Sequence, residues 1–216
     1  MFKIENLKVA NIIEIKELQI EDQSVTCIVG QSGSGKSTFL RLLNNLDTPD
    51  EGIIYYRNDD IRKSDPVELR RKVIMVPQAP VIFDGTVRDN LLIGLRFAEK
   101  PAVDDERLNN ALKEMKLNKT LEANAADLSG GEKQRLALAR VLLMDGDVFL
   151  LDEPSSALDD STALLVIKTF VAYVKANQKS MVMITHDKQL GELVADKIIY
   201  MDRFSKTVAM KEHNDE

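Results

Sequence analysis

A glycine-rich segment near the N-terminus limits the possible folds of this chain more than any other stretch. Residues 30–37 read GQSGSGKS, which satisfies the pattern G-x-x-x-x-G-K-[ST]. The apolar run Val25–Val29 precedes this segment directly, and the helix-like run Thr38–Leu46 follows it. A strand, a glycine-rich loop and a helix in this order bind phosphate groups, so the sequence predicts an α/β fold with a nucleotide site.

Each residue type in this loop suits the binding of ATP with Mg²⁺. The glycines let the backbone curl so that successive N–H groups point at phosphate oxygens, towards which the following helix directs the positive end of its dipole. Lys36 is expected to reach the β and γ phosphates, and Ser37 to offer its hydroxyl to Mg²⁺, which prefers oxygen ligands. The predicted ATP-contacting residues here are Gly30, Gln31, Ser32, Gly33, Ser34, Gly35, Lys36, Ser37 and Thr38.

Further apolar runs of strand length alternate with helix-like segments, which favours a largely parallel sheet. These runs are Val73–Val76, Val148–Leu151 and Met181–Thr185. Shorter alternating segments near the N-terminus predict a small antiparallel sheet: Phe2–Leu7, Ile12–Ile20 and Gly52–Arg57, with a turn at Asn58–Asp59. The expected fold class is α/β, a P-loop NTPase with a RecA-like parallel core and this second sheet beside it.

A polar, helix-prone stretch separates two of the predicted parallel strands by far more than a simple crossover needs. It predicts a helical lobe inserted at approximately residues 83–140. Neither a repeat nor a shift in composition marks a second domain, so residues 1–216 are expected to form one domain.

Acidic side chains and a histidine follow two of the predicted strands. Asp152 and Glu153 come at the end of Val148–Leu151, where ligands of open α/β sheets bind, and His186 closes the run Met181–Thr185. Asp152 is expected to hold Mg²⁺ through water, and Glu153 to act as the general base that orients the attacking water. His186 is expected to contact the γ-phosphate, whereas His213 in the tail receives no role.

Composition excludes several other classes. The formal net charge is −6 and no long basic run is present, so nucleic acid is not the expected partner. The single cysteine, Cys27, lies within an apolar run and is expected to be a buried core residue. One cysteine cannot form an internal disulfide, which fits a protein of a reducing compartment.

The N-terminus does not have the pattern of a signal peptide, and the apolar stretch Ala163–Val174 is interrupted by Lys168 and too short to cross a bilayer. We therefore expect a cytoplasmic protein that reaches a membrane only through another subunit.

The segment 128–135, LSGGEKQR, resembles the signature sequence of the ATP-binding-cassette (ABC) ATPases. It also predicts a helix start, because Ser129 as N-cap and Glu132 three residues later form a capping box. The resemblance implies that Ser129, Gly130, Gly131 and Glu132 bind the γ-phosphate of ATP held by an opposite subunit, at an exposed helix N-terminus.

The rest of the family pattern is similar over nearly the whole chain. Gln78 resembles the Q-loop glutamine, which contacts Mg²⁺ and the γ-phosphate, and Asp159 in Ser156–Asp159 resembles the D-loop aspartate at the dimer interface. By the same resemblance His186 is the switch histidine and Asp152 the Walker B aspartate. One departure concerns adenine: the family has an aromatic residue near position 9, where this chain has Lys8, Val9 and Ala10. Apolar contact from Val9 or Ile12 is the expected substitute.

The resemblance implies an ATPase subunit that forms a homodimer, or pairs with a related ATPase, around ATP. It also implies a separate integral membrane subunit, contacted through Gln78 and residues 83–87, with the ATPase peripheral on the cytoplasmic face. Residues 77–87, 185–188 and 195–197 are similar to compact ATPases of metal-efflux systems, with an amino-acid importer as the nearest alternative. A regulatory ABC ATPase of the cell-division type stays open. A small-molecule kinase would leave the signature unexplained.

Overall fold

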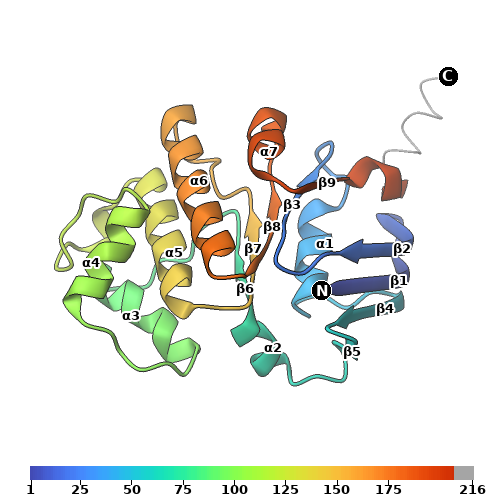
Figure 1. The fold of residues 1–216 in the computed structure, drawn as a ribbon, viewed down its shortest axis with the longest axis horizontal. Helices are drawn as coiled ribbons and strands as arrows, with labels where there is room; N and C mark the ends of the chain where they lie inside the picture. The colour runs from blue at the N-terminus through green and yellow to red at the C-terminus, as the bar shows by residue number, and fades with distance from the viewer. Residues whose placement is uncertain (207–216) are drawn as a thin grey trace.

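The computed structural model describes residues 1–206, so His213 lies outside the described residues. Two sheets lie in the molecule, with helices around and between them (Figure 1). The larger sheet is parallel and has the strand order β6-β7-β8-β3-β9. Its strands are β3 (Val25–Val29), β6 (Val73–Val76), β7 (Val148–Asp152), β8 (Ser180–Ile184) and β9 (Lys197–Tyr200).

The smaller sheet is antiparallel and has the order β2-β1-β4-β5. Its strands are β1 (Phe2–Val9), β2 (Ile13–Ile20), β4 (Glu51–Tyr56) and β5 (Asp59–Asp60). The turn that joins β4 to β5 is made by Arg57 and Asn58, both with positive φ, so the predicted turn at Asn58–Asp59 is wrong by one residue. Asp59 pairs with Tyr56 instead, because two left-handed residues close a tight hairpin.

The helices lie on both faces of the parallel sheet. They are α1 (Lys36–Leu43), α2 (Pro66–Lys72), α3 (Val87–Phe97), α4 (Asp105–Glu114), α5 (Gly130–Met144), α6 (Asp160–Ala176), α7 (Lys188–Val194), η1 (Ala125–Asp127) and η2 (Met201–Phe204). Helix α1 lies between the two sheets, whereas α3, α4, α5 and α6 lie on the opposite side of the parallel sheet (Figure 1). Among residues 1–206 no helix is both long and apolar enough to span a bilayer.

The three central parallel strands, β3, β7 and β8, are buried on both faces, and alternate residues of these strands enter two different apolar cores. Phe149 and Leu151 of β7 pack with α3, α4, α5 and α6, whereas Val148 and Leu150 pack with α1 and the antiparallel sheet. Cys27 is fully buried in the first of these cores, as expected, and burial raises the pKa of its thiol to about 12. Burial on both faces explains why these strands read as continuous apolar runs.

The predicted α/β fold class, with its parallel and antiparallel sheets, is confirmed. The proposed inserted lobe at 83–140 contains α3, α4 and most of α5, which continues to Met144. The first helix of this lobe, α3, begins at a capping box between Thr86 and Asp89.

Candidate functional site

The predicted phosphate-binding residues lie at one edge of the parallel sheet. Strands β7, β8 and β3 are neighbours, and their carboxyl ends lead to Asp152, to His186 and to the glycine-rich loop. Strand β6, on the other side of β7, leads to Gln78. The carboxyl ends of adjacent parallel strands meet at one edge, so the topology brings these groups together.

The glycine-rich loop has the backbone conformation that its sequence predicts. Gly33 and Gly35 have φ values of 82° and 92°, in the left-handed region. A Cβ at Gly35 would lie 2.7 Å from the Ile13 side chain, so the loop packs tightly on the start of β2. The helix begins at Lys36, two residues before the predicted Thr38, because Gly35 is its N-cap.

Lys36 folds back over its own loop and is only 6% exposed. Its Nζ donates hydrogen bonds to the carbonyl oxygens of Gly30, at 2.9 Å, and Gln31, at 2.8 Å. Burial lowers the pKa of Lys36, while the nearby carboxylates of Glu153, Asp202 and Asp152 oppose that shift. The ammonium group is thus held at the start of the loop, beside the cavity that Lys36 lines.

Ser37 and Asp152 form a hard-oxygen pair suited to Mg²⁺. The Ser37 hydroxyl donates to Asp152 Oδ1 over 3.2 Å, and burial raises the pKa of Asp152. Within residues 1–206 no cluster of three or more His, Cys, Asp or Glu side chains could hold a metal. An ion between Ser37 and Asp152 would therefore take further oxygen ligands from nucleotide and water, as Mg²⁺ usually does.

Glu153 lies between Gln78 and His186. Gln78 Nε2 donates to Glu153 Oε2 over 3.0 Å, and His186 Nε2 lies 2.6 Å from Glu153 Oε1. Glu153 has a φ of 48°, which costs a residue other than glycine about 1–3 kcal/mol. Its N–H donates to the Ile184 carbonyl of the neighbouring strand over 3.1 Å. The Glu153 backbone is thus held by β8, and its carboxylate is held between the side chains of Gln78 and His186.

These groups line a cavity of about 420 Å³. Its lining combines the glycine-rich loop and the start of α1 with the three polar side chains and one apolar residue of the turn between β1 and β2: Ile12, Ser32, Gly33, Gly35, Lys36, Ser37, Thr38, Gln78, Glu153 and His186. Ile12 lines this cavity and Val9 does not, so Ile12 is the better placed of the two to contact adenine. The lining does not include Ser129, Gly130, Gly131, Glu132 or Asp159.

The segment predicted as the signature forms a helix N-terminus, as its sequence indicates. Ser129 N donates to Glu132 Oε2 and Glu132 N donates to Ser129 Oγ, which completes the predicted capping box at the start of α5. A Cβ at Gly130 would meet nothing within 4 Å, so the backbone there is uncovered. Asp159 caps α6, and hydrogen bonds from Ser161 and Thr162 lower its pKa.

One residue of this region was not predicted from the sequence. Asp202, in η2, accepts a hydrogen bond from Gln31 N over 2.9 Å. A single acid after a weakly apolar strand has no sequence pattern that would have pointed to the loop.

Comparison with known proteins identifies the family. The ABC transporter family matches residues 14–156. The chain is 35% identical over 214 residues to the L-cystine import ATP-binding protein TcyN of Bacillus subtilis (strain 168), covering 94% of this chain and 82% of that one. It is 35% identical over 190 residues to the phosphate import ATP-binding protein PstB 3 of Natronomonas pharaonis, covering 83% and 68%. The ATP-binding cassette MJ0796, solved as a post-hydrolysis dimer with ADP and Pi, has a TM-score of 0.83 and 28% identity over 95% of each chain.

The chain belongs to the ABC transporter family, as its ATP-binding subunit or domain. It is an ATPase, and its nucleotide is ATP. Residues 128–135 indicated membership of this family by resemblance, and that prediction is confirmed.

Proposed function

We propose that two copies of this chain, or this chain and a related ATPase, close around ATP and drive a separate membrane subunit. The observation that carries the proposal is the separation, within one chain, of the cavity at Lys36 from the uncovered helix N-terminus at residues 129–132. The cavity at Lys36 has no contribution from residues 129–132, yet these residues form an uncovered helix N-terminus. A second copy can supply the missing helix end to each cavity through a two-fold arrangement. The cassette MJ0796, which has a similar fold, was solved as a dimer bound to ADP and Pi.

Within each cavity the proposed roles follow from the contacts. Lys36 would exchange its two backbone acceptors for phosphate oxygens, and Ser37, Asp152 and Gln78 would hold Mg²⁺, which would neutralise phosphate charge when bound. Glu153 would accept a proton from the attacking water as general base. His186, at 2.6 Å from Glu153, would hold that carboxylate and contact the γ-phosphate.

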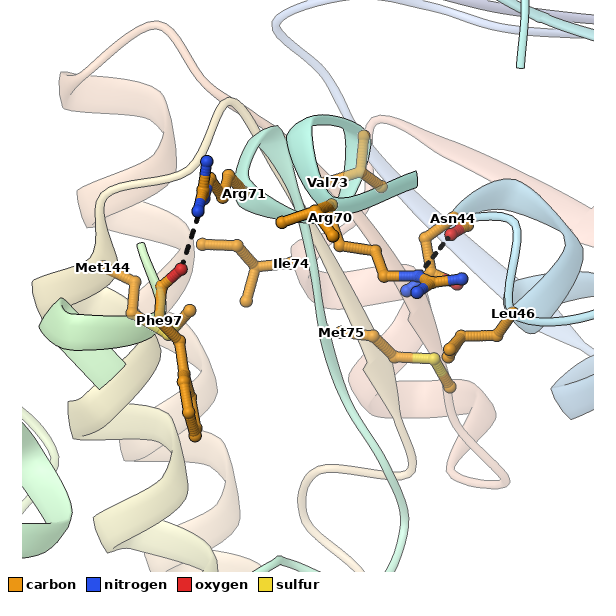
Figure 2. Close-up of a pocket in the computed structure, with 10 residues that line it drawn as sticks. Asn44, Leu46, Arg70, Arg71, Val73, Ile74, Met75, Phe97 and Met144 are labelled. Atoms are coloured by element: carbon orange, nitrogen blue, oxygen red, sulfur yellow. Dashed lines mark hydrogen bonds between the residues drawn. The ribbon is translucent and has the colours of Figure 1, made fainter. Parts of the chain in front are cut away.

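A second surface supports pairing with a membrane subunit. A groove of about 390 Å³ lies between the parallel sheet core and the helical lobe and is lined mainly by apolar residues, among them Leu46, Met75 and Phe97 (Figure 2). Arg70 and Arg71 lie at the same groove, but both donate to backbone oxygens, Arg70 to Asn44 and Asn45 and Arg71 to Phe97. Part of the donor capacity of both guanidinium groups is therefore used within the chain, and most of the remaining lining of the groove is apolar.

The groove continues towards Gln78. An adjoining apolar pocket of about 210 Å³ shares Met75 and Phe97 with it and extends to Pro77 and Phe83. Leu46, Val81 and Phe97 are each at least half exposed around this surface. We propose that a short amphipathic helix of the membrane subunit places its apolar side here, next to the loop that carries Gln78.

Copurification tests the transport role. The tagged chain, extracted from its own membranes in mild detergent, should retain one integral membrane protein, identified by mass spectrometry, that stimulates ATP hydrolysis when reconstituted. The variant Phe97→Asp should lose that protein by at least about tenfold, because a carboxylate is costly to bury in an apolar contact.

Leu193→Asp is the matched control, since Leu193 is 57% exposed on α7 and Phe97 is 56% exposed. Equal retention by both variants would contradict the groove as the docking surface. Absence of any integral partner with the unaltered chain would contradict the transport role and favour the regulatory alternative.

The named relatives serve the import of cystine and of phosphate, so related cassettes act on different cargoes. We therefore propose that the membrane subunit, and not this chain, selects the cargo. Metal ions, exported from the cell, are one class of cargo within this proposal. The same names favour transport over a cell-division role. The cytoplasmic face of the membrane, where ATP is available, is the proposed location.

A further inference from the structure

The first peptide unit of the phosphate loop is held from both of its polar ends. The Gly30 carbonyl accepts a hydrogen bond from Lys36 Nζ over 2.9 Å. The N–H of the same peptide unit, that of Gln31, donates to Asp202 Oδ1 over 2.9 Å. A peptide group bonded in this way cannot turn over without losing both bonds.

Asp202 reaches the loop because of the sheet topology. Strands β3 and β9 are parallel neighbours, and Val29 at the end of β3 pairs with Tyr200 at the end of β9. The chain then turns through η2 directly beside the loop, anchored by Met201, which is fully buried. The strand pairing therefore brings Asp202 beside the glycine loop.

The close approach leaves little room for a side chain at position 30. A Cβ there would lie 3.0 Å from Asp202 Oδ1, 2.9 Å from Ser34 Oγ and 3.3 Å from Met201 Cβ. Gly30 has no positive φ, so it is the space and not the backbone conformation that calls for glycine.

The turn after β9 also holds the strand on which the loop packs. Ser205 forms a bridge with Ile13, and Lys206 N donates to the Ile12 carbonyl over 3.0 Å. Ile12 and Ile13 are the residues that a Cβ at Gly35 would meet. Residues 201–206 thus brace both ends of the phosphate loop, the first end directly and the second through β2.

We propose that Asp202 is a positioning residue for nucleotide binding: it fixes the Gly30–Gln31 peptide so that its carbonyl faces Lys36 and the loop stays open for phosphate. The role depends on the hydrogen-bond acceptor and not on the charge, since a carboxylate beside a phosphate site by itself opposes anion binding. This proposal rests on the nucleotide site proposed above.

Binding of Mg²⁺–ADP to the full chain, measured by isothermal titration calorimetry, tests the proposal without hydrolysis. Asp202→Ala should weaken binding by about tenfold, because the loss of one positioning hydrogen bond is of this size. Asp202→Asn keeps an amide oxygen as acceptor and should bind within about twofold of the unaltered chain. Asp202→Glu keeps the charge but displaces the acceptor, and should lose about three- to tenfold.

Asp196→Ala is the matched control. Asp196 Oδ2 accepts from Val25 N over 2.9 Å, a carboxylate-to-backbone bond at the opposite end of the same strand β3. This variant should lose about as much free energy of unfolding as Asp202→Ala, as measured with denaturant, without losing affinity for ADP. Thermal unfolding without nucleotide shows which variants are folded, and the Asn and Glu variants carry the test if Asp202→Ala does not fold.

Unchanged affinity in folded Asp202→Ala would overturn the proposal, as would an Asp202→Asn variant as weak as the alanine one, which would assign the effect to charge. Failure of the unaltered chain to bind Mg²⁺–ADP would instead contradict the proposed nucleotide site itself.

Discussion

At the residue scale, the two glycines that begin α5 lie in different surroundings. A Cβ at Gly130 would meet nothing within 4 Å. A Cβ at Gly131 would lie 2.8 Å from the Ala157 carbonyl oxygen and 3.1 Å from Leu158 Cδ2. Gly131 therefore allows the proposed signature helix to pack against the proposed D-loop of its own chain, whereas Gly130 is free to face another molecule.

Alanine at each position should separate these roles. Gly131→Ala should lower the free energy of unfolding by about 1–3 kcal/mol, because a backbone carbonyl must move. Gly130→Ala should leave it within about 0.5 kcal/mol while lowering ATP hydrolysis, since the methyl group covers N–H groups that we propose face the partner's ATP. Urea unfolding and an ATPase assay measure the two effects; equal unfolding free energies for both variants would contradict the packing role of Gly131.

Much of the candidate site could be predicted from sequence at this scale. Lys36, Ser37, Asp152, Glu153 and His186 follow strands or a glycine loop, and parallel strands bring such positions to one edge. The bond from Gln31 to Asp202 could not be predicted, because it depends on which strand lies beside β3. The assigned roles of these residues stay predictions.

At the element scale, Arg140 of α5 joins the loop after Gln78 to the helical lobe. Its guanidinium donates to Asn90 O at 2.7 Å, Asn90 Oδ1 at 2.8 Å and Val81 O at 2.8 Å, and it lies 5.1 Å from the centre of the Phe83 ring. Only 8% of the residue is exposed, and burial lowers the pKa of Arg140 to about 10. The guanidinium stays protonated at neutral pH and holds residues 81–90 together.

Removing this side chain should loosen that loop. Arg140→Ala should lower the free energy of unfolding by about 2–4 kcal/mol, because three oxygens, two of them in buried hydrogen bonds, lose their shared donor. Hydrogen exchange at Phe83 N, which donates to Asn90 Oδ1, should speed up. Arg140→Lys should give a smaller loss, since one ammonium group cannot reach all three oxygens.

Lys168→Ala, at an exposed position of α6, should change stability by less than about 0.5 kcal/mol. An unchanged exchange rate at Phe83 N in Arg140→Ala would show that the loop is held by other contacts.

Apolar patterning located most strands but not all boundaries. Strands β3 and β6 have the predicted bounds, because strands buried on both faces read as uninterrupted apolar runs. The edge strand β9 was not among the predicted strands, since only one of its four residues is buried. Helix α1 ends at Leu43 instead of Leu46, and Asn45 follows with a positive φ that a propensity argument does not reveal.

At the scale of the whole molecule, the parallel sheet presents the nucleotide cavity at one edge while the helical lobe presents an uncovered helix end elsewhere. We propose that this helix end, with Ser129 as its cap, completes the cavity of a second copy. ATP would then favour the closed pair only while its γ-phosphate is intact, which couples hydrolysis to opening.

Sedimentation of the Glu153→Gln variant with saturating Mg²⁺–ATP tests this claim most directly. Without its proposed general base the chain should bind ATP, fail to hydrolyse it and sediment as a dimer. Adding Ser129→Phe should return it to a monomer that still binds ATP, because the bulky ring blocks the helix end. A Glu153→Gln chain that stays monomeric with ATP bound, or a double variant that dimerises as well, would contradict the account.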